Sequence, residues 1–325
     1  MDTSRTDYPI LHTAMDRGVE TITGLMTSLV TLTEEQDPEW VYWMQGEYRF
    51  PTKGKEKLVL SLFASMVDVS DTLNRSFFER LDNCVLTSAT LKVNDSFDYF
   101  SGRIGLDNIE DVIRKEFLSP FLYNEQVGYY QYAGKRELSN DPEGIGEVVY
   151  QLHKKFNKRI MVLFTSIKTL TDTAKYLRAK PSGRDLPLFA QVRGASRPSI
   201  IKGMHQQPNG ILFGTNSFWE GVDLPGDLLE ILVLVKLPFD VPSEPLVRSY
   251  SDHINKMGGN SFMDYSLPET TIRFRQGFGR LIRTSYDAGK FICLDNRIVL
   301  KRYGPILSGS VPVEMVPFSD FDSIE

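Results

Sequence analysis

The sequence predicts an α/β fold in which helices cover both faces of a parallel sheet, preceded by a mainly helical lead-in. From about residue 125 onward, continuous apolar runs alternate with amphipathic segments whose apolar residues recur at helical spacing. Strands of a parallel sheet give such runs because both of their faces are covered by the connecting helices. The alternation therefore indicates successive βαβ units.

The lead-in has a different pattern. Apolar residues between positions 10 and 29 recur at helical spacing, and two strands are expected at 39–50 and 58–70, around a polar turn. The run CVLTSATL, residues 84–91, is β-branched and aliphatic. We expect it to be a buried strand that ends in a Ser/Thr turn.

The α/β part begins with a strand and a helix whose start is well marked, since Asp141 is a suitable N-cap and Pro142 suits the first helical position. Further helices are expected after residues 166 and 196. The strands are expected within 128–133, 159–166, 186–192, 210–217, 228–239 and 290–297.

Composition excludes several classes of protein. The 325 residues hold 37 Lys and Arg against 42 Asp and Glu, a formal net charge of −5, which argues against a histone-like binder. No apolar run reaches the length of a membrane span, and the acidic N-terminus lacks the basic start of a signal peptide. Cys84 and Cys293 are too few for a disulfide framework or an iron–sulfur cluster. These features favour a reducing cytoplasm.

The net charge conceals a gradient along the chain. Residues 1–50 hold nine acidic and three basic side chains, whereas residues 267–302 hold eight basic and three acidic ones. Such a basic strip either meets phosphate groups or forms a solvated helix face, and charge alone leaves both interpretations open.

Ligands of parallel sheets bind beyond the carboxyl ends of the strands, so chemistry is expected in the strand-to-helix turns. The turn at 214–227 follows a buried strand and brings Gly214 and Gly221 together with Glu220 and Asp223. Glycines allow close backbone approach, and the free amides of such a turn can contact phosphate. The alternative is a long loop with incidental acids.

A second unusual segment, RFRQGFGRLIRT at 273–284, is expected to be a helix. Spacings of four and seven residues place Gln276, Arg280 and Arg283 within about 40° of one another on that helix. Its two glycines each cost a helix interior about 1 kcal/mol relative to alanine, which a surface helix has no obvious reason to accept. Two guanidinium groups beside an amide suit the charge of a transferring phosphoryl group. A basic solvated helix is the alternative.

Taken in order, these segments resemble the motifs of superfamily 2 DNA helicases of the DinG type, which are relatives of XPD. LTSATL (86–91) resembles motif III, LFTS (163–166) motif IV, GTNSFWEGVDLPGD (214–227) motif V and QGFGRLIR (276–283) motif VI. The flanking strings SPF, LPFDVPSEP, DAGKFICLDNR and RYG fit the same pattern. The resemblance covers about residues 60–310 and implies a RecA-like fold.

The resemblance also implies roles. Arg280 and Arg283 would be arginine fingers that reach ATP bound by a partner domain. The residues implied at the nucleotide are Gln276, Gly279, Glu220, Gly221 and Asp223, the last three also coupling nucleotide state to DNA. Those implied at the sugar-phosphate backbone of single-stranded DNA are Thr165, Ser166, Gly214, Thr215 and Asn216. Those implied to link ATP hydrolysis to strand movement are Thr87, Ser88 and Thr90.

The departures from the family pattern affect the domain organisation. A helicase motor needs a Walker A loop, GxxxxGK[ST], and an acidic Walker B motif for Mg²⁺, and the sequence has neither. We therefore expect 1–55 to be the end of an inserted arch-like helical region, 56–124 the last strands of a first motor domain with a connection, and 125–325 the second RecA-like domain. ATP and Mg²⁺ are then cofactors of the intact protein, and the isolated chain is expected to be inactive.

Three functions follow as alternatives. The first is half of a bacterial, cytoplasmic ATP-dependent DNA helicase of DNA repair, moving 5′ to 3′ by resemblance, whose partners are single-stranded DNA and the missing first helicase domain of the same polypeptide. The second is the DNA-binding, helicase-like region of a DinG-type 3′-to-5′ exonuclease. The third is a non-enzymatic nucleic-acid-binding module. In each, Phe218 or Trp219 is conceivable as an aromatic wedge, although packing beneath motif V is favoured.

Overall fold

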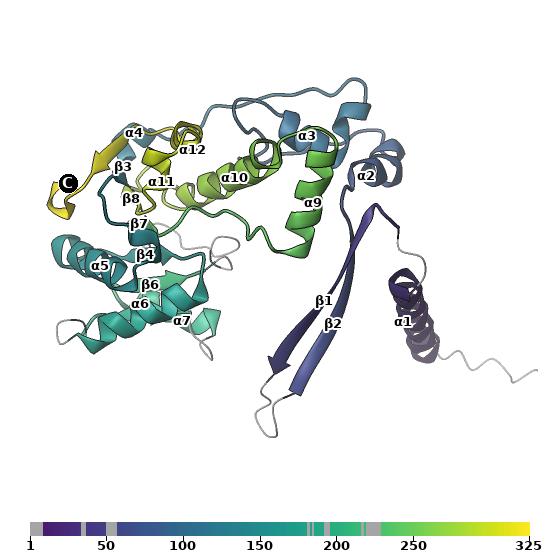
Figure 1. Cartoon of the computed structure of the whole chain (residues 1–325), viewed down its shortest axis with the longest axis horizontal. Coiled ribbons are helices and arrows are strands. Elements are labelled where there is room, and N and C mark those ends of the chain that lie inside the picture. The colour runs from purple at the N-terminus through teal and green to yellow at the C-terminus, as the bar shows by residue number, and fades with distance from the viewer. Residues whose placement is uncertain are drawn as a thin grey trace, which may run out of the picture. The chain divides into compact units, whose positions relative to one another are not determined.

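The computed structural model describes residues 9–33, 37–49, 57–180, 183, 185–191, 196–215, 218 and 229–325. These residues belong to two compact units (Figure 1). Unit 1 comprises residues 1–80, 103–105 and 241–261, and unit 2 comprises residues 81–102, 106–240 and 262–325. No helix in the described part of the chain combines the length and apolar character that a membrane crossing requires.

Unit 1 contains one long helix and a β-hairpin, as the lead-in pattern predicts. Strands β1 and β2 pair antiparallel along their whole length, and the rings of Trp43 and Phe63 stack across the pair with centroids 4.9 Å apart. The predicted boundary at residue 55 falls between these two paired strands. The elements are α1 (Pro9–Thr33), β1 (Trp40–Arg49), β2 (Lys57–Met66), α2 (Ser70–Ser76), η1 (Phe78–Arg80) and α9 (Pro245–Lys256).

Unit 2 is built on a seven-stranded sheet in which every pair is parallel, in the order β5-β6-β4-β7-β8-β3-β9. All six strands that were predicted after residue 125 are confirmed. The seventh, β9, escaped prediction because it is a half-exposed edge strand with an internal proline, which gives little apolar signal. The strands are β3 (Val127–Tyr132), β4 (Ile160–Leu163), β5 (Leu188–Ala190), β6 (Ile211–Gly214), β7 (Ile231–Leu234), β8 (Gly289–Cys293) and β9 (Met315–Phe318).

Helices cover both faces of this sheet, because alternate strand residues point to opposite sides. In β4, Ile160 and Val162 pack with α5 (Pro142–Phe156) and α6 (Ile167–Ala179). Met161 and Leu163 belong to the other core, beneath α7 (Arg197–Gln206) and α10 (Leu267–Phe278). The remaining elements are α3 (Asp98–Ile104), η2 (Leu106–Asn108), α4 (Tyr123–Gln126), η3 (Leu138–Asn140), η6 (Phe262–Ser266), α11 (Arg297–Leu300), α12 (Gly304–Ser308) and η7 (Phe321–Ser323).

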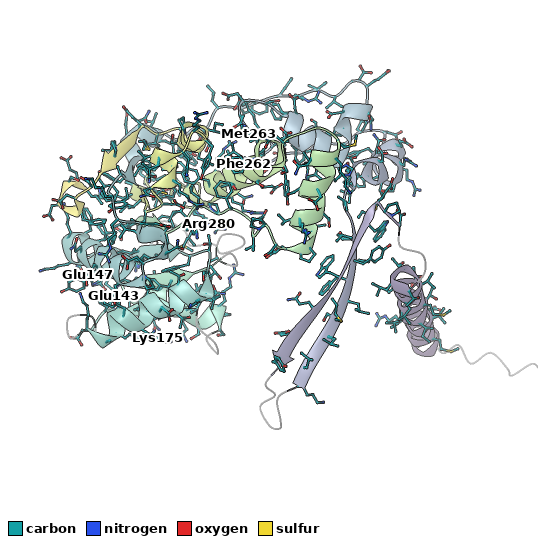
Figure 2. The ribbon with its side chains drawn as sticks, viewed as in Figure 1. Glu143, Glu147, Lys175, Phe262, Met263 and Arg280 are labelled. Atoms are coloured by element: carbon teal, nitrogen blue, oxygen red, sulfur yellow. The ribbon has the colours of Figure 1, made fainter. Side chains whose placement is uncertain are left out.

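The first connecting helix begins as predicted. The Asp141 carboxylate accepts a hydrogen bond from the Gly144 amide at 3.0 Å, and Pro142 occupies the first position of α5. Glu147 then joins α5 to α6, accepting hydrogen bonds from Tyr176 Oη at 2.5 Å and from Lys180 (Figure 2). Both the predicted α/β class and the predicted N-cap of α5 are thus confirmed.

The prediction of a buried strand at residues 84–91 is wrong. The segment is irregular, and Val85 is 88% exposed. A strand needs a neighbour for its backbone hydrogen bonds, and neither sheet of the described residues takes this segment as a member. Apolar character alone therefore did not make it a strand.

Candidate functional site

The carboxyl ends of two adjacent strands bring together the segments that resemble motifs IV and V. Leu163 of β4 pairs with Gly214 of β6, and the amide of Phe164 donates to the carbonyl of Gly214 at 2.9 Å. Thr165 and Ser166 therefore leave the sheet beside Thr215. Ser166 also caps α6, because its Oγ accepts from the Thr169 amide at 3.3 Å.

Thr215 is oriented by the next strand along the sheet. Its amide and its Oγ1 both donate to Gln191 Oε1, each at 2.9 Å. Gly214 lies against Phe218, since a Cβ at this glycine would come within 2.8 Å of the Phe218 side chain. Phe218 is 1% exposed, so the favoured packing interpretation is confirmed for this residue. Asn216, Trp219, Glu220, Gly221 and Asp223 lie outside the described residues.

A small pocket opens at this carboxyl edge. Two of its residues, Asn140 and Lys236, have no place in the sequence prediction, and Lys236 Nζ donates to Asn140 Oδ1 at 3.1 Å. Lys236 comes two residues after β7, and Asn140 lies in the connection between β3 and α5. A position in a connection after a strand is the signal that could have identified them. The pocket is lined by Ser139, Asn140, Phe164, Thr165, Ser166, Thr169, Val235 and Lys236. Hydroxyl groups, an amide and one cation suit a phosphate group.

The motif VI segment departs from the expected helix. α10 ends at Phe278 with Gly279 as its C-cap, so Arg280 and Arg283 do not share a helix face with Gln276. They lie in the connection to β8, which is a helix-to-strand turn instead of the expected strand-to-helix turn. Glycine has a low helix propensity, and this favours an end of the helix at Gly279. Beyond it, the amides of Arg283 and Thr284 donate to a side-chain carboxylate and not to helix carbonyls.

That acceptor is Asp287. Its Oδ2 accepts from the amides of Arg283 and Thr284, both at 2.8 Å, and its Oδ1 accepts from Thr284 Oγ1 at 2.8 Å. Burial alone would raise the pKa of Asp287, but these hydrogen bonds outweigh burial and hold the pKa below its ordinary value. Gln126, next to the start of β3, donates to the carbonyls of Thr284 at 3.2 Å and Asp287 at 2.8 Å.

Buried neighbours anchor the arginine-bearing connection. Leu281 and Ile282, which lie between the two arginines, are 1% and 3% exposed. Arg280 is half-buried close to the end of α10, where Figure 2 labels it, and Arg283 is exposed. The two arginines are thus attached to the core through the residues between them.

The basic strip is not uniform. Arg273 forms two hydrogen bonds with the Asp240 carboxylate, at 2.6 and 3.0 Å. Partial burial tends to lower the pKa of Arg273, but the hydrogen bond and charge of Asp240 raise it above its ordinary value. Arg297 is paired with the buried Asp295 at 2.6 Å. Part of the strip is therefore structural, and charge density alone did not distinguish these arginines from the others.

Arg275 connects α10 to the motif III-like segment. Its guanidinium donates to the carbonyl of Ala89 at 3.0 Å and to the carbonyl of Lys92. Within that segment, the Thr90 amide donates to Ser88 Oγ at 3.2 Å, while Thr87 is exposed. The helix that bears Gln276 thus holds the segment of the proposed coupling residues.

The predicted site residues lie at opposite ends of the strands, which we call the two edges of the sheet: the carboxyl edge, where strands end, and the amino edge, where they begin. Thr165 and Thr215 lie at the carboxyl ends of β4 and β6. Residues 283–287 lie where β3 and β8 begin, since Gln126 directly precedes β3 and Val127 pairs with Gly289. The guanidinium groups suit the phosphate end of a nucleotide. Among the described residues, no group of three or more His, Cys, Asp and Glu side chains is placed to hold a metal ion.

Comparison with solved structures shows the fold. The chain is similar to a structure titled XPD helicase, with a TM-score of 0.56 and 17% identity, over 79% of this chain and 46% of that one. A second, titled XPD apo, has the same TM-score at 15% identity, over 79% of this chain and 53% of that one.

Sequence relatives carry helicase or exonuclease names. The 3′-5′ exonuclease DinG of Bacillus subtilis is 35% identical over 86% of this chain and 30% of its own length. The ATP-dependent DNA helicase YoaA of Haemophilus influenzae is 30% identical over 92% of this chain and 44% of its own length. The ATP-dependent DNA helicase DinG of Photobacterium profundum is 32% identical over 76% of this chain and 36% of its own length. The chain thus spans less than half the length of these relatives.

The family match coincides with the α/β unit. The pattern of the helicase C-terminal domain family matches residues 149–314, from within α5 to just before β9. That range contains the segments that resemble motifs IV, V and VI. The chain therefore belongs to the helicase C-terminal domain family.

Proposed function

We propose that this chain supplies the second RecA-like half of an ATP-dependent DNA helicase. The observation that carries the proposal is the division of the site between two edges of one sheet, with the arginines at one and Thr165 and Thr215 at the other. A motor whose nucleotide is held by another domain needs separate surfaces for nucleotide and DNA. The domain division at residues 55 and 124 belongs to this proposal.

In this proposal, Arg280 and Arg283 stabilise the charge on the transferring phosphoryl group of ATP, which supplies the phosphoryl-transfer chemistry when it is bound by the first motor domain. Gln276, Gly279 and the motif V acids lie near the same nucleotide. Thr165, Ser166, Gly214, Thr215 and Asn216 contact the backbone of single-stranded DNA. Thr87, Ser88 and Thr90 transmit hydrolysis to strand movement, held against α10 by Arg275.

The isolated chain is expected to show no ATP turnover. Residues 1–325 lack a Walker A loop, so the nucleotide has no phosphate cradle of the kind that motor domains use. The test compares phosphate release by the isolated chain and by the intact protein, each with Mg²⁺ and single-stranded DNA. The intact protein should hydrolyse ATP, and robust turnover by the isolated chain would overturn the proposal.

The Lys236→Ala variant of the intact protein is expected to bind single-stranded DNA more weakly and with less salt dependence. Removing one phosphate contact should reduce the slope of log affinity against log salt by about 0.7. Fluorescence anisotropy at several salt concentrations measures this slope. Lys175→Ala, an exposed lysine on α6 (Figure 2), is the matched control, and equal slopes for the two variants would contradict a DNA contact at the pocket.

A second candidate function is the helicase-like region of a 3′-5′ exonuclease. The relative from Bacillus subtilis carries that name, at 35% identity over 86% of this chain. Incubating the intact protein with a labelled partial duplex separates the two functions. A helicase releases a full-length strand, whereas an exonuclease shortens the strand from its 3′ end. The relatives from Bacillus subtilis, Haemophilus influenzae and Photobacterium profundum are all bacterial proteins, and this supports a bacterial cytoplasmic location for the chain.

A further inference from the structure

The connection between α10 and β8 keeps its shape with little help from apolar packing. Ile282 is buried and Gly289 begins a strand, but residues 283–286 and 288 between them are exposed. Tyr286, the largest side chain of the turn, is 94% exposed. An exposed turn with so little buried apolar surface is ordered mainly by its hydrogen bonds. Those bonds therefore fix the position of the Arg283 backbone.

The bonds converge on one carboxylate and one amide. Asp287 accepts three hydrogen bonds, two of them from the amide and hydroxyl of Thr284 and one from the amide of Arg283 itself. Charge-assisted bonds of this kind are about twice as strong as neutral ones. Gln126 holds the same turn from outside by donating to the carbonyls of Thr284 and Asp287.

These contacts connect the arginine to the sheet. Gln126 lies directly before Val127, which pairs with Gly289 in the first residue pair of β3 and β8. The backbone of Arg283 is therefore tied through Asp287 and Gln126 to the beginning of two central strands. A rigid attachment of this kind restricts the arc through which a long arginine side chain can move, and such preorganisation favours catalysis.

We infer that Asp287, Thr284 and Gln126 form a brace that aims Arg283 at the nucleotide, so that Asp287 and Gln126 are positioning residues for ATP hydrolysis. This inference rests on the proposed function, in which Arg283 is an arginine finger. Neither positioning residue touches the nucleotide. Their effect on hydrolysis passes through the backbone of the turn.

The test uses steady-state ATP hydrolysis by the intact protein at saturating single-stranded DNA. Asp287→Ala is expected to lower kcat by about ten- to a hundredfold, with little change in KM for ATP or in DNA affinity. Gln126→Glu is nearly isosteric but places a carboxylate against two carbonyl oxygens, so it should lower kcat in the same way. Asp320→Ala is the control, because this exposed aspartate caps the Asp322 amide in another turn.

A double-mutant cycle separates positioning from general structural damage. If Asp287 acts through Arg283, adding Asp287→Ala to Arg283→Ala should lower kcat no further, whereas independent effects would multiply. Wild-type kcat in both Asp287→Ala and Gln126→Glu, or multiplied losses in the double variant, would overturn the brace. Should Asp287→Ala fail to fold, Gln126→Glu in the Arg283→Ala background gives the same comparison.

The same data distinguish this inference from the proposed function. Wild-type hydrolysis by Arg283→Ala would remove the finger assignment and the brace together. A large loss in Arg283→Ala combined with wild-type hydrolysis in the two brace variants would leave the finger in place and overturn the brace alone.

Discussion

Replacing Arg280 with alanine in the intact protein is expected to abolish ATP hydrolysis while leaving the binding of single-stranded DNA unchanged. An arginine finger contributes about a thousandfold or more to phosphoryl transfer, because its guanidinium meets charge that develops only in the transition state. DNA affinity should persist because the proposed DNA residues lie at the other edge of the sheet, beyond the carboxyl ends of β4 and β6. Phosphate release and fluorescence anisotropy on the same preparation measure both.

Two further variants test whether the loss of ATP hydrolysis is specific to the guanidinium group of Arg280. Arg280→Lys keeps the charge but loses the planar fork of donors, so it should recover little of the activity. Arg178→Ala removes an exposed arginine from the last turn of α6 and should hydrolyse ATP normally. Normal hydrolysis by Arg280→Ala would refute the assignment of this residue as a finger.

Replacing Asp295 with alanine is expected to lower the free energy of unfolding by about 3 kcal/mol, because one side of a buried ion pair is lost. The residue has no exposed surface, and its carboxylate accepts from the Leu237 amide at 2.9 Å and from Arg297 at 2.6 Å. Alanine would leave that buried amide unsatisfied and the half-buried guanidinium without its carboxylate. Thermal unfolding should shift downward by roughly 6–12 °C for a unit of this size.

The matched control is Asp172→Ala. Asp172 forms a surface ion pair with Lys175 on α6 at 3.7 Å, and exposed pairs contribute little to stability. Asp295→Asn should fall between the two alanine variants, since it keeps one acceptor oxygen but loses the charge. Equal unfolding temperatures for Asp295→Ala and Asp172→Ala would show that the buried pair contributes no more than the surface pair.

The fold was largely predictable because its signals are local and repeated. Each central strand is a continuous apolar run between polar turns, and α5 begins with the Asp141–Pro142 pair that the cap requires. Two of the failures have a common physical cause. Residues 84–91 and the segment after Phe278 have the composition of regular elements, but regularity also depends on partners that the local sequence does not specify.

The residues proposed for the site come from the sequence, whereas their geometry was predictable only in part. The spacing of Gln276, Arg280 and Arg283 suits one helix face, but Gly279 and the Asp287 carboxylate end the helix before the arginines. Gln126 is 158 residues from Thr284 in the chain, so no local pattern indicates that it holds that turn. Lys236 and Asn140 meet only in the folded chain, because Lys236 follows β7 whereas Asn140 lies in η3, 96 residues away in the sequence.

Strand length gives the two-edged arrangement a mechanical meaning. β4, β6 and β7 are each four residues long, which corresponds to about 13 Å of extended backbone. Both edges are thus joined by short, hydrogen-bonded rods with helices packed along each side. We expect such a body to move as one unit, so that a shift imposed where the arginines lie displaces the carboxyl ends of the strands by a similar amount. A domain of this kind would couple nucleotide-dependent movement at one end of the strands to movement at the other end.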